Sequence, residues 1–118
     1  MLNYEYKKYK MKNGIEGISI VFADKKYQIL TTFLLCDVVS FEEWIKEDFE
    51  KVVSGISEYE EINGNACCAE ISRTTTRIYD NLAEDGMGDW CEVDTTELVK
   101  LINECCKKVR EFNNEYHN

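Results

Sequence analysis

Hydrophobic and polar residues alternate along the N-terminal third of the chain in a pattern that predicts antiparallel strands. Residues 3–12 alternate tyrosine with polar residues, and a change of phase near Lys7–Lys8 indicates a β-bulge. Asn13–Gly14 is a strong two-residue turn signal, and residues 15–23 form the next expected strand. The apolar run at residues 27–35 (YQILTTFLL) predicts a third and central strand.

Two later segments have the apolar spacing of amphipathic helices. In the first, Ser40 stands three residues before Glu43 as a capping box, and Gly55 ends the helix. Its apolar face consists of Phe41, Trp44, Ile45, Phe49, Val52 and Val53. In the second, Asp94 is the expected N-cap, with Glu97 three residues later. Its apolar face consists of Leu98, Leu101, Ile102, Cys105, Val109, Phe112 and Tyr116.

Three short strands are expected between these helices, at residues 66–72, 75–82 and 89–93, with turn chemistry at Asn63–Gly64 and at residues 85–88. The order of elements is therefore β-β-β-α-β-β-β-α. This order predicts an α+β fold: one mostly antiparallel sheet of about six strands, with two helices packed on one face. At 118 residues, the chain is expected to form a single domain, residues 1–118.

Negative charge is concentrated in two segments, and the formal net charge is -9. Residues 36–61 hold nine acids and two lysines, and residues 80–97 hold seven acids and no base. Such a field repels phosphate backbones and attracts cationic surfaces. The short basic run at residues 7–12 is too small for a nucleic-acid site, so no nucleic-acid partner is expected. The pattern favours a cationic protein partner, although a solvated acidic surface would have the same composition.

The sequence does not predict an enzyme or a cofactor. The six cysteines include two adjacent pairs and no C-x-x-C motif, so we expect buried, reduced thiols rather than disulfides or zinc ligands. The only histidine, His117, is the penultimate residue, and the glycines fit no phosphate-binding loop. The acids at Asp80, Glu84, Asp85 and Asp89 lack the spacing of a calcium loop.

The N-terminus lacks the apolar run of a secretory signal, and no segment is long enough to span a membrane as a helix. We therefore expect a cytoplasmic protein with no membrane partner. Tyr59, Tyr79 and Trp90 lie among the acidic residues, where aromatic side chains could serve an interface. For Trp90, a position in the core is the favoured interpretation.

Residues 40–104 contain a series of local features in a fixed order. These are a helix ending at Ser54–Gly55, an acidic link to Gly64–Asn65, and a Thr-rich strand at residues 74–76. An acidic turn, the pair Trp90–Cys91 and a final helix that begins with D-T-x-E-L-x-x-L-I (residues 94–102) complete the pattern. In this pattern the chain resembles small bacterial immunity proteins of the CdiI/YacL-like kind.

This resemblance implies an antidote to a contact-dependent growth-inhibition toxin, often a nuclease, that acts by occlusion and has no catalytic residues. The expected partner is the cognate toxin's C-terminal domain, and the expected state is a monomer or weak dimer. The contact residues are predicted from charge alone. They are Glu58, Glu60, Glu61, Asp80, Glu84, Asp85 and Asp89.

Two other interpretations remain open at the level of sequence. One is a regulatory or structural module that self-associates through an edge strand such as residues 3–12. The other is a small-molecule-binding domain with a pocket between sheet and helices. Its candidate polar residues are Gln28, Thr31 and Thr32, although these are expected to face solvent.

Overall fold

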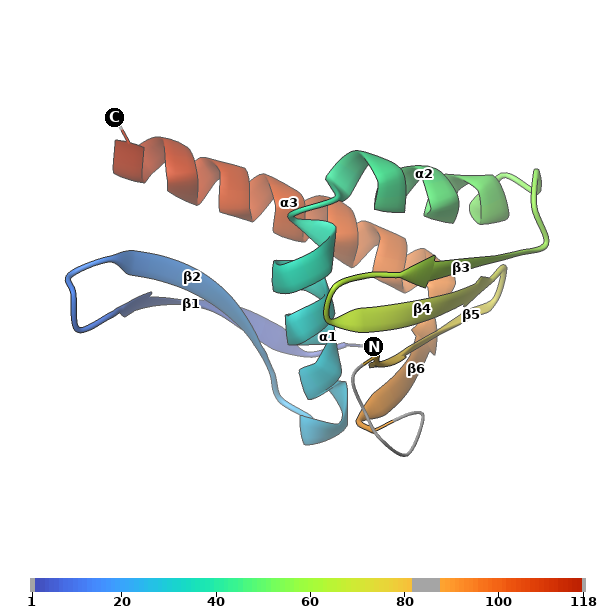
Figure 1. Ribbon diagram of the computed structural model, residues 1–118, viewed down its shortest axis with the longest axis horizontal. Coiled ribbons are helices and arrows are strands. Elements are labelled where there is room, and N and C mark those ends of the chain that lie inside the picture. The colour runs from blue at the N-terminus through green and yellow to red at the C-terminus, as the bar shows by residue number, and fades with distance from the viewer. Residues whose placement is uncertain (1, 82–87, 118) are drawn as a thin grey trace.

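The computed structural model describes residues 2–81 and 88–117, which form two separate antiparallel sheets and a set of helices (Figure 1). The α+β class is confirmed, whereas the prediction of one six-stranded sheet is wrong. One sheet has two strands and the other has four, in the order β3-β4-β5-β6. No helix within the described residues is long and apolar enough to cross a membrane.

The two-stranded sheet consists of β1 (Tyr4–Lys10) and β2 (Glu16–Phe22), joined by a turn that contains Asn13–Gly14. The turn prediction is confirmed: Gly14 has a φ of 86°, and the Asn13 carboxamide accepts a hydrogen bond from the Ile15 amide at 3.0 Å. The register runs without interruption from Tyr4 opposite Phe22 to Lys10 opposite Glu16, so the bulge predicted near Lys7–Lys8 is wrong.

The predicted strand at residues 27–35 is a helix. A 3₁₀ turn (η1, Lys25–Tyr27), α1 (Gln28–Thr32) and a π-helical turn (η2, Phe33–Val38) follow one another without a break. In Figure 1 this segment stands between the two sheets, so it is buried on several sides. A short apolar run buried in this way shows no clear period, and a helix and a central strand cannot then be distinguished by pattern.

The helix α2 (Glu42–Val53) lies where the sequence predicts, but its capping box does not form. The N-cap is Phe41, which makes no side-chain cap hydrogen bond. The Phe41 amide instead donates to the Asp37 carbonyl of the preceding helical turn at 2.9 Å, because the chain enters α2 directly from η2. Gly55, with a φ of 87°, follows the end of the helix as expected.

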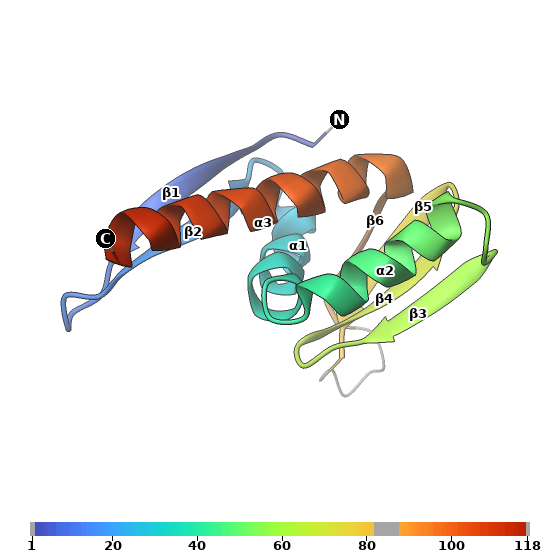
Figure 2. The same ribbon diagram turned by 90° about the horizontal axis from the view of Figure 1, so that it is seen from above.

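The four-stranded sheet contains β3 (Tyr59–Asn63), β4 (Cys67–Ser72), β5 (Thr75–Asp80) and β6 (Trp90–Asp94). The sequence predicts the last three of these strands but no strand at residues 59–63. The helix α3 (Thr95–His117) follows β6 directly. Its predicted cap is confirmed, since the Asp94 carboxylate accepts from the Glu97 amide at 2.9 Å. Both α2 and α3 cover the same face of this sheet (Figure 2).

A buried carboxylate joins the π-helical turn to the β3–β4 hairpin. The side chain of Asp37 has no exposed surface and accepts hydrogen bonds from the amides of Asn65 (2.9 Å), Ala66 (3.2 Å) and Cys67 (2.8 Å). Gly64 packs against this carboxylate so closely that a Cβ there would lie 2.6 Å from it. The hairpin is therefore fixed to the helical core by one side chain.

A second polar contact, also buried, joins the start of α3 to the β4–β5 hairpin. The Thr95 hydroxyl donates to the Ser72 carbonyl at 2.7 Å and lies 2.8 Å from the Thr76 hydroxyl. Thr95 and Thr76 are both fully buried. Since the Thr95 proton is used on Ser72, the Thr76 hydroxyl donates to Thr95.

All six cysteines are free, and five of them are buried. Burial raises the pKa of the Cys67 and Cys91 thiols to about 12 and that of Cys105 to about 11. These side chains pack as small apolar groups, as the sequence predicts. Cys36 is the exception because it is exposed.

Candidate functional site

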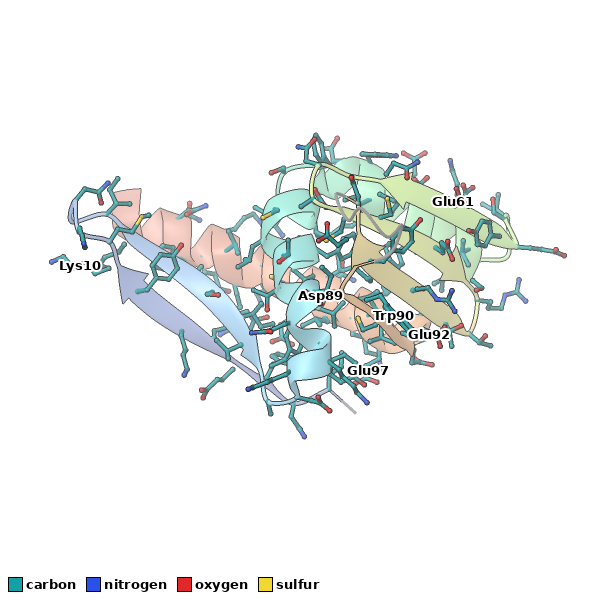
Figure 3. The ribbon with its side chains drawn as sticks, turned by 60° about the horizontal axis from the view of Figure 1, so that its bottom comes forward. Lys10, Glu61, Asp89, Trp90, Glu92 and Glu97 are labelled. Atoms are coloured by element: carbon teal, nitrogen blue, oxygen red, sulfur yellow. The ribbon has the colours of Figure 1, made fainter. Side chains whose placement is uncertain are left out.

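The four-stranded sheet has one covered face and one open face. Ile62, Ile71, Ile78 and Val93 point toward α2 and α3 and are buried. Because successive side chains of a strand point to opposite faces, their neighbours in sequence point away from the helices. No described element packs against this outward side, which forms the front of the sheet in Figure 3. We call this surface the open sheet face. It comprises Tyr59, Glu61, Asn63, Cys68, Glu70, Ser72, Thr75, Arg77, Tyr79, Trp90, Glu92 and Asp94.

An acidic row crosses the middle of the open sheet face. Glu61 of β3 lies opposite Glu70 of β4, which lies opposite Arg77 of β5, which lies opposite Glu92 of β6. Arg77 donates to the Glu92 carboxylate from Nε at 3.1 Å and from Nη2 at 2.6 Å. The row thus has three carboxylates and one guanidinium. Like charges directly opposite in a sheet are destabilising, so the Glu61–Glu70 pair costs stability in the isolated protein.

Aromatic side chains flank this acidic row. Trp90 is 48% exposed and Tyr59 is 47% exposed, while Tyr79 is half-buried and lies opposite Trp90. The Arg77 guanidinium lies 5.4 Å from the centre of the Trp90 ring, within range of a cation–π contact. The interpretation of Trp90 as a core residue is wrong, because Trp90 belongs to the outward register of β6, whose inward positions are Cys91 and Val93.

Tyr59 adds a polar contact at the edge of the open sheet face. Its hydroxyl donates to the Glu61 carboxylate at 2.7 Å. Burial and this carboxylate raise the pKa of Tyr59 above its usual value, so the phenol stays protonated at neutral pH. The open sheet face therefore combines carboxylates with oriented, partly exposed aromatic rings, a combination suited to a cationic protein surface.

The structure separates the acids that the sequence groups together. Glu61 lies on the open sheet face, and Glu58 is exposed just before β3. Glu60 points to the helix side, where Ser57 donates to its carboxylate at 2.9 Å. There, burial and then the charge of Glu60 raise the pKa of Asp48. Glu60 and Glu61 are adjacent in sequence, yet they serve different faces.

Two acids of the second predicted group, Asp80 and Asp89, lie at the other end of the sheet. Asp80 ends β5, opposite Cys67, and is half-buried on the covered side. Asp89 is exposed immediately before β6, and its carbonyl accepts from the Asp80 amide at 3.0 Å. Glu84 and Asp85 lie outside the described residues. Of the five predicted contact residues that the structure describes, only Glu61 belongs to the open sheet face.

Sequence reasoning did not select Glu70 and Glu92, which complete the acidic row. The signal that marks them is the alternation of small or apolar residues with polar ones. In ACCAEIS, the buried Ala69 and Ile71 flank Glu70, and in WCEVD, the buried Cys91 and Val93 flank Glu92. Charge density along the chain does not distinguish such positions, because a sheet face is assembled from every second residue of several strands.

A separate cleft of about 430 Å³ lies between β2 and α1. Its lining includes Lys25, Gln28, Thr31, Thr32 and Asp89. Thr31 does not face solvent as expected, because it is half-buried and its hydroxyl donates to the Ile20 carbonyl at 2.8 Å. The structure thus places all three polar residues of the small-molecule interpretation in one cleft. That cleft is wide open, and the Thr31 hydroxyl is already engaged with the backbone.

Similarity to a known protein indicates the family of this chain. The chain is 42% identical over 96 residues to a protein of Bacillus cereus named "Immunity protein". The match spans 81% of this chain and 82% of the relative. The chain belongs to this family of immunity proteins. No family model matches the chain, and no solved structure matches it. An immunity protein has a toxin as its partner, so the open sheet face can be considered as a surface that binds one.

Proposed function

We propose that this immunity protein binds the C-terminal domain of a cognate toxin and neutralises it by covering a basic active site with the open sheet face. The toxin is a nuclease delivered by contact-dependent growth inhibition, and the complex forms in the cytoplasm of the recipient cell. The observation that carries the proposal is the acidic row of Glu61, Glu70 and Glu92 beside the exposed ring of Trp90, on a face that no described element covers.

The physical argument is electrostatic substitution. A nuclease holds its substrate by lysine and arginine contacts to phosphates, and a row of carboxylates on a rigid sheet presents negative charge to those same side chains. A charged row also steers encounter, so the association rate falls as salt rises. No catalysis is involved, since the protein acts by occupying the site.

The like-charge pair Glu61–Glu70 supports this assignment. In the free protein the pair is unfavourable, whereas a cation placed between the two carboxylates turns the same arrangement into a favourable one. Aromatic rings at the edges of the row exclude water from it, and truncating one side of a desolvated charge pair costs about 2–5 kcal/mol. Exposed pairs at the rim contribute about 0–1 kcal/mol. We therefore expect a few costly positions among many silent ones.

The first test is co-expression of the chain with the toxin domain encoded beside it, followed by growth rescue, co-purification and affinity at 50 to 500 mM salt. The double variant Glu61→Gln, Glu70→Gln should raise the Kd at least tenfold, and Trp90→Ala should do the same. The matched control, Glu50→Gln with Glu111→Gln, removes the same charge from exposed positions of α2 and α3 and should change the Kd less than twofold.

Two results would overturn the proposal. Absence of both binding and growth rescue would exclude toxin neutralisation. Binding that is unchanged by the Glu61→Gln, Glu70→Gln variant would exclude the open sheet face as the surface used. The seven acids selected from charge in the sequence remain predicted toxin contacts, and the same affinity measurement tests them. If alanine at each of them leaves the affinity within about twofold, that set is wrong. They are Glu58, Glu60, Glu61, Asp80, Glu84, Asp85 and Asp89.

A further inference from the structure

The β1–β2 hairpin forms an arm with a surface opposite in charge to the open sheet face. Figures 1 and 2 show it extending beside α3, at the far end of the molecule from the four-stranded sheet. Tyr4 and Lys8 point toward α3, where they contact Glu104 and the Phe112 ring, so the alternate residues Lys7 and Tyr9 point away from it. We call the outward set the arm surface. It comprises Glu5, Lys7, Tyr9, Met11, Ile15, Ser19 and Val21, together with Lys12 in the turn at the tip. Lys7 and Glu5 form an exposed ion pair at 3.3 Å.

The arm surface combines exposed apolar groups with positive charge. Tyr9 is 49% exposed, and Met11 and Ile15 are exposed by more than half. Residues 4–22 contain four lysines against two glutamates in a chain whose net charge is -9. On the arm surface itself, Lys7 and Lys12 stand against Glu5, so its charge is net positive. Exposed apolar side chains beside such charges are typical of an interaction surface, and the arm surface is suited to an acidic, partly aromatic one.

The arm surface is also held in a fixed position. The Tyr9 ring lies across Gly17 of β2, so closely that a Cβ at Gly17 would be 2.3 Å from it. At the base of the arm, the Tyr4 hydroxyl donates to Glu104 at 2.8 Å, and the Leu2 amide donates to Glu97 at 2.6 Å. An aromatic side chain that is ordered before binding loses little entropy on binding.

We infer that the arm surface binds the open sheet face of a second copy of this chain. The complementary chemistry is present within the one sequence. Lys12 matches the carboxylates of Glu61 and Glu70, and Lys7 does so in exchange for its exposed pair with Glu5. Tyr9 and Met11 match the rings of Tyr59 and Trp90. The contact joins a strand surface to a strand surface through side chains, so it differs from pairing along the edge of β1.

The placement of the two surfaces favours a closed dimer. Figure 3 shows the arm and the four-stranded sheet in front of α3, with Lys10 near the tip of the arm and Trp90 and Glu92 on the sheet. Two copies that face each other head to tail, related by a two-fold axis, bring each arm onto the other's sheet. In that arrangement the arm surface and the open sheet face of each copy are both covered. With a single contact per pair, one surface of each kind would stay uncovered, and further copies would add to form a chain.

The dimer is weak, because two molecules of net charge -9 repel one another. At physiological salt the screening length is about 8 Å, so charges within the contact dominate over those elsewhere. Moderate salt therefore permits the contact and high salt weakens it. Self-association requires no toxin, so it can be tested independently of the proposed function.

The test is sedimentation equilibrium of the full chain from 10 µM to 1 mM at 150 mM salt. The arm variant Lys7→Glu, Lys12→Glu and the face variant Glu61→Lys, Glu70→Lys should each remain monomeric. An equimolar mixture of the two should recover the dimer, because each contact in the mixed pair again joins opposite charges. The control Lys100→Glu, Lys107→Glu makes the arm variant's charge change on exposed positions of α3 and should still dimerise.

Each outcome decides the inference. A wild-type chain that stays monomeric at 1 mM excludes it. A dimer that both the arm variant and the face variant retain shows that another surface is used. Loss of the dimer in both variants without recovery in the mixture shows that the arm and the face do not contact each other. Circular dichroism of each variant separates these results from misfolding. If the proposed function also holds, toxin and dimer compete for the same face, and added toxin domain should convert dimers to one-to-one complexes.

Discussion

The buried carboxylate of Asp37 gives the sharpest stability prediction. It accepts hydrogen bonds from three backbone amides, those of Asn65, Ala66 and Cys67, and has no exposed surface. Asp37→Ala removes the acceptor of all three donors, of which the Cys67 amide is buried and the other two are partly buried. A hydrogen bond to a charged group contributes about 1.5–3 kcal/mol, and the three are not additive, so we expect a loss of about 4 kcal/mol. For a domain of this size, that loss lowers the Tm by roughly 15 °C.

Gly64 allows the same contact to be tested from the other side. A Cβ at Gly64 would lie 2.6 Å from the Asp37 carboxylate, so Gly64→Ala should push the carboxylate off its donors at a cost of about 2 kcal/mol. In the Asp37→Ala background this clash is gone. There, Gly64→Ala should be neutral or stabilise by about 0.5 kcal/mol, because alanine restricts the unfolded chain.

The assay is urea denaturation followed by far-ultraviolet circular dichroism for the wild type, both single variants and the double variant. The control is Asp24→Ala, which removes an exposed aspartate that accepts one backbone hydrogen bond, from the Lys26 amide at 3.1 Å. It should cost about 1 kcal/mol or less. The reasoning is refuted if Asp37→Ala costs no more than this control, or if the effects at Asp37 and Gly64 simply add.

Three further predictions concern other contacts. Lys46 and the Arg110 guanidinium hold the pKa of Glu42 at about 2, below that of the unfolded chain, so this stability is present above about pH 4.5 and is lost as pH falls through 2. Glu42→Gln should therefore cost about 1 kcal/mol at pH 7, after allowance for solvent screening, and little at pH 2, as urea midpoints at the two pH values would show. Thr95→Val should cost about 2 kcal/mol and Thr76→Val about half of that, because only the first leaves another buried hydroxyl, that of Thr76, without an acceptor. Equal urea midpoints for the two variants would contradict the assignment of donors. Ellman's reagent should label one thiol, Cys36, within minutes in the native protein and six in urea, and rapid labelling of several would contradict the burial of the others.

Local sequence signals predicted the elements whose boundaries depend on local chemistry. Asn13–Gly14 places the turn of the arm, and Asp94 with Glu97 places the start of α3, because each acts through backbone groups within a few residues. The helix at residues 25–38 could not be predicted in this way. Phe33, Leu34 and Val38 have no exposed surface. Because the segment is buried on several sides, its apolar residues show neither the period of a helix nor that of a strand.

The candidate site was only partly predictable for a related reason. Charge density along the chain led to Glu61, but it also led to Glu60, which the strand turns to the other face. Glu70 stands alone among small or apolar residues, and Glu92 is one of seven acids in residues 80–97, so charge density does not single out either of them. Their proximity depends on the strand order β3-β4-β5-β6, which comes from tertiary packing and not from any one segment.

The alternation of buried and outward positions in β3–β6 also shapes how this protein can evolve. Every substitution at an outward position, such as Glu70 or Trp90, changes what the surface recognises while the neighbouring core residue stays in place. An insertion or deletion of one residue within these strands has the opposite effect. It moves the charged side chains into the core and the apolar ones into water, so the chain no longer folds. New specificities should therefore arise by point substitution within the strands, while changes in length accumulate only in the connections between them.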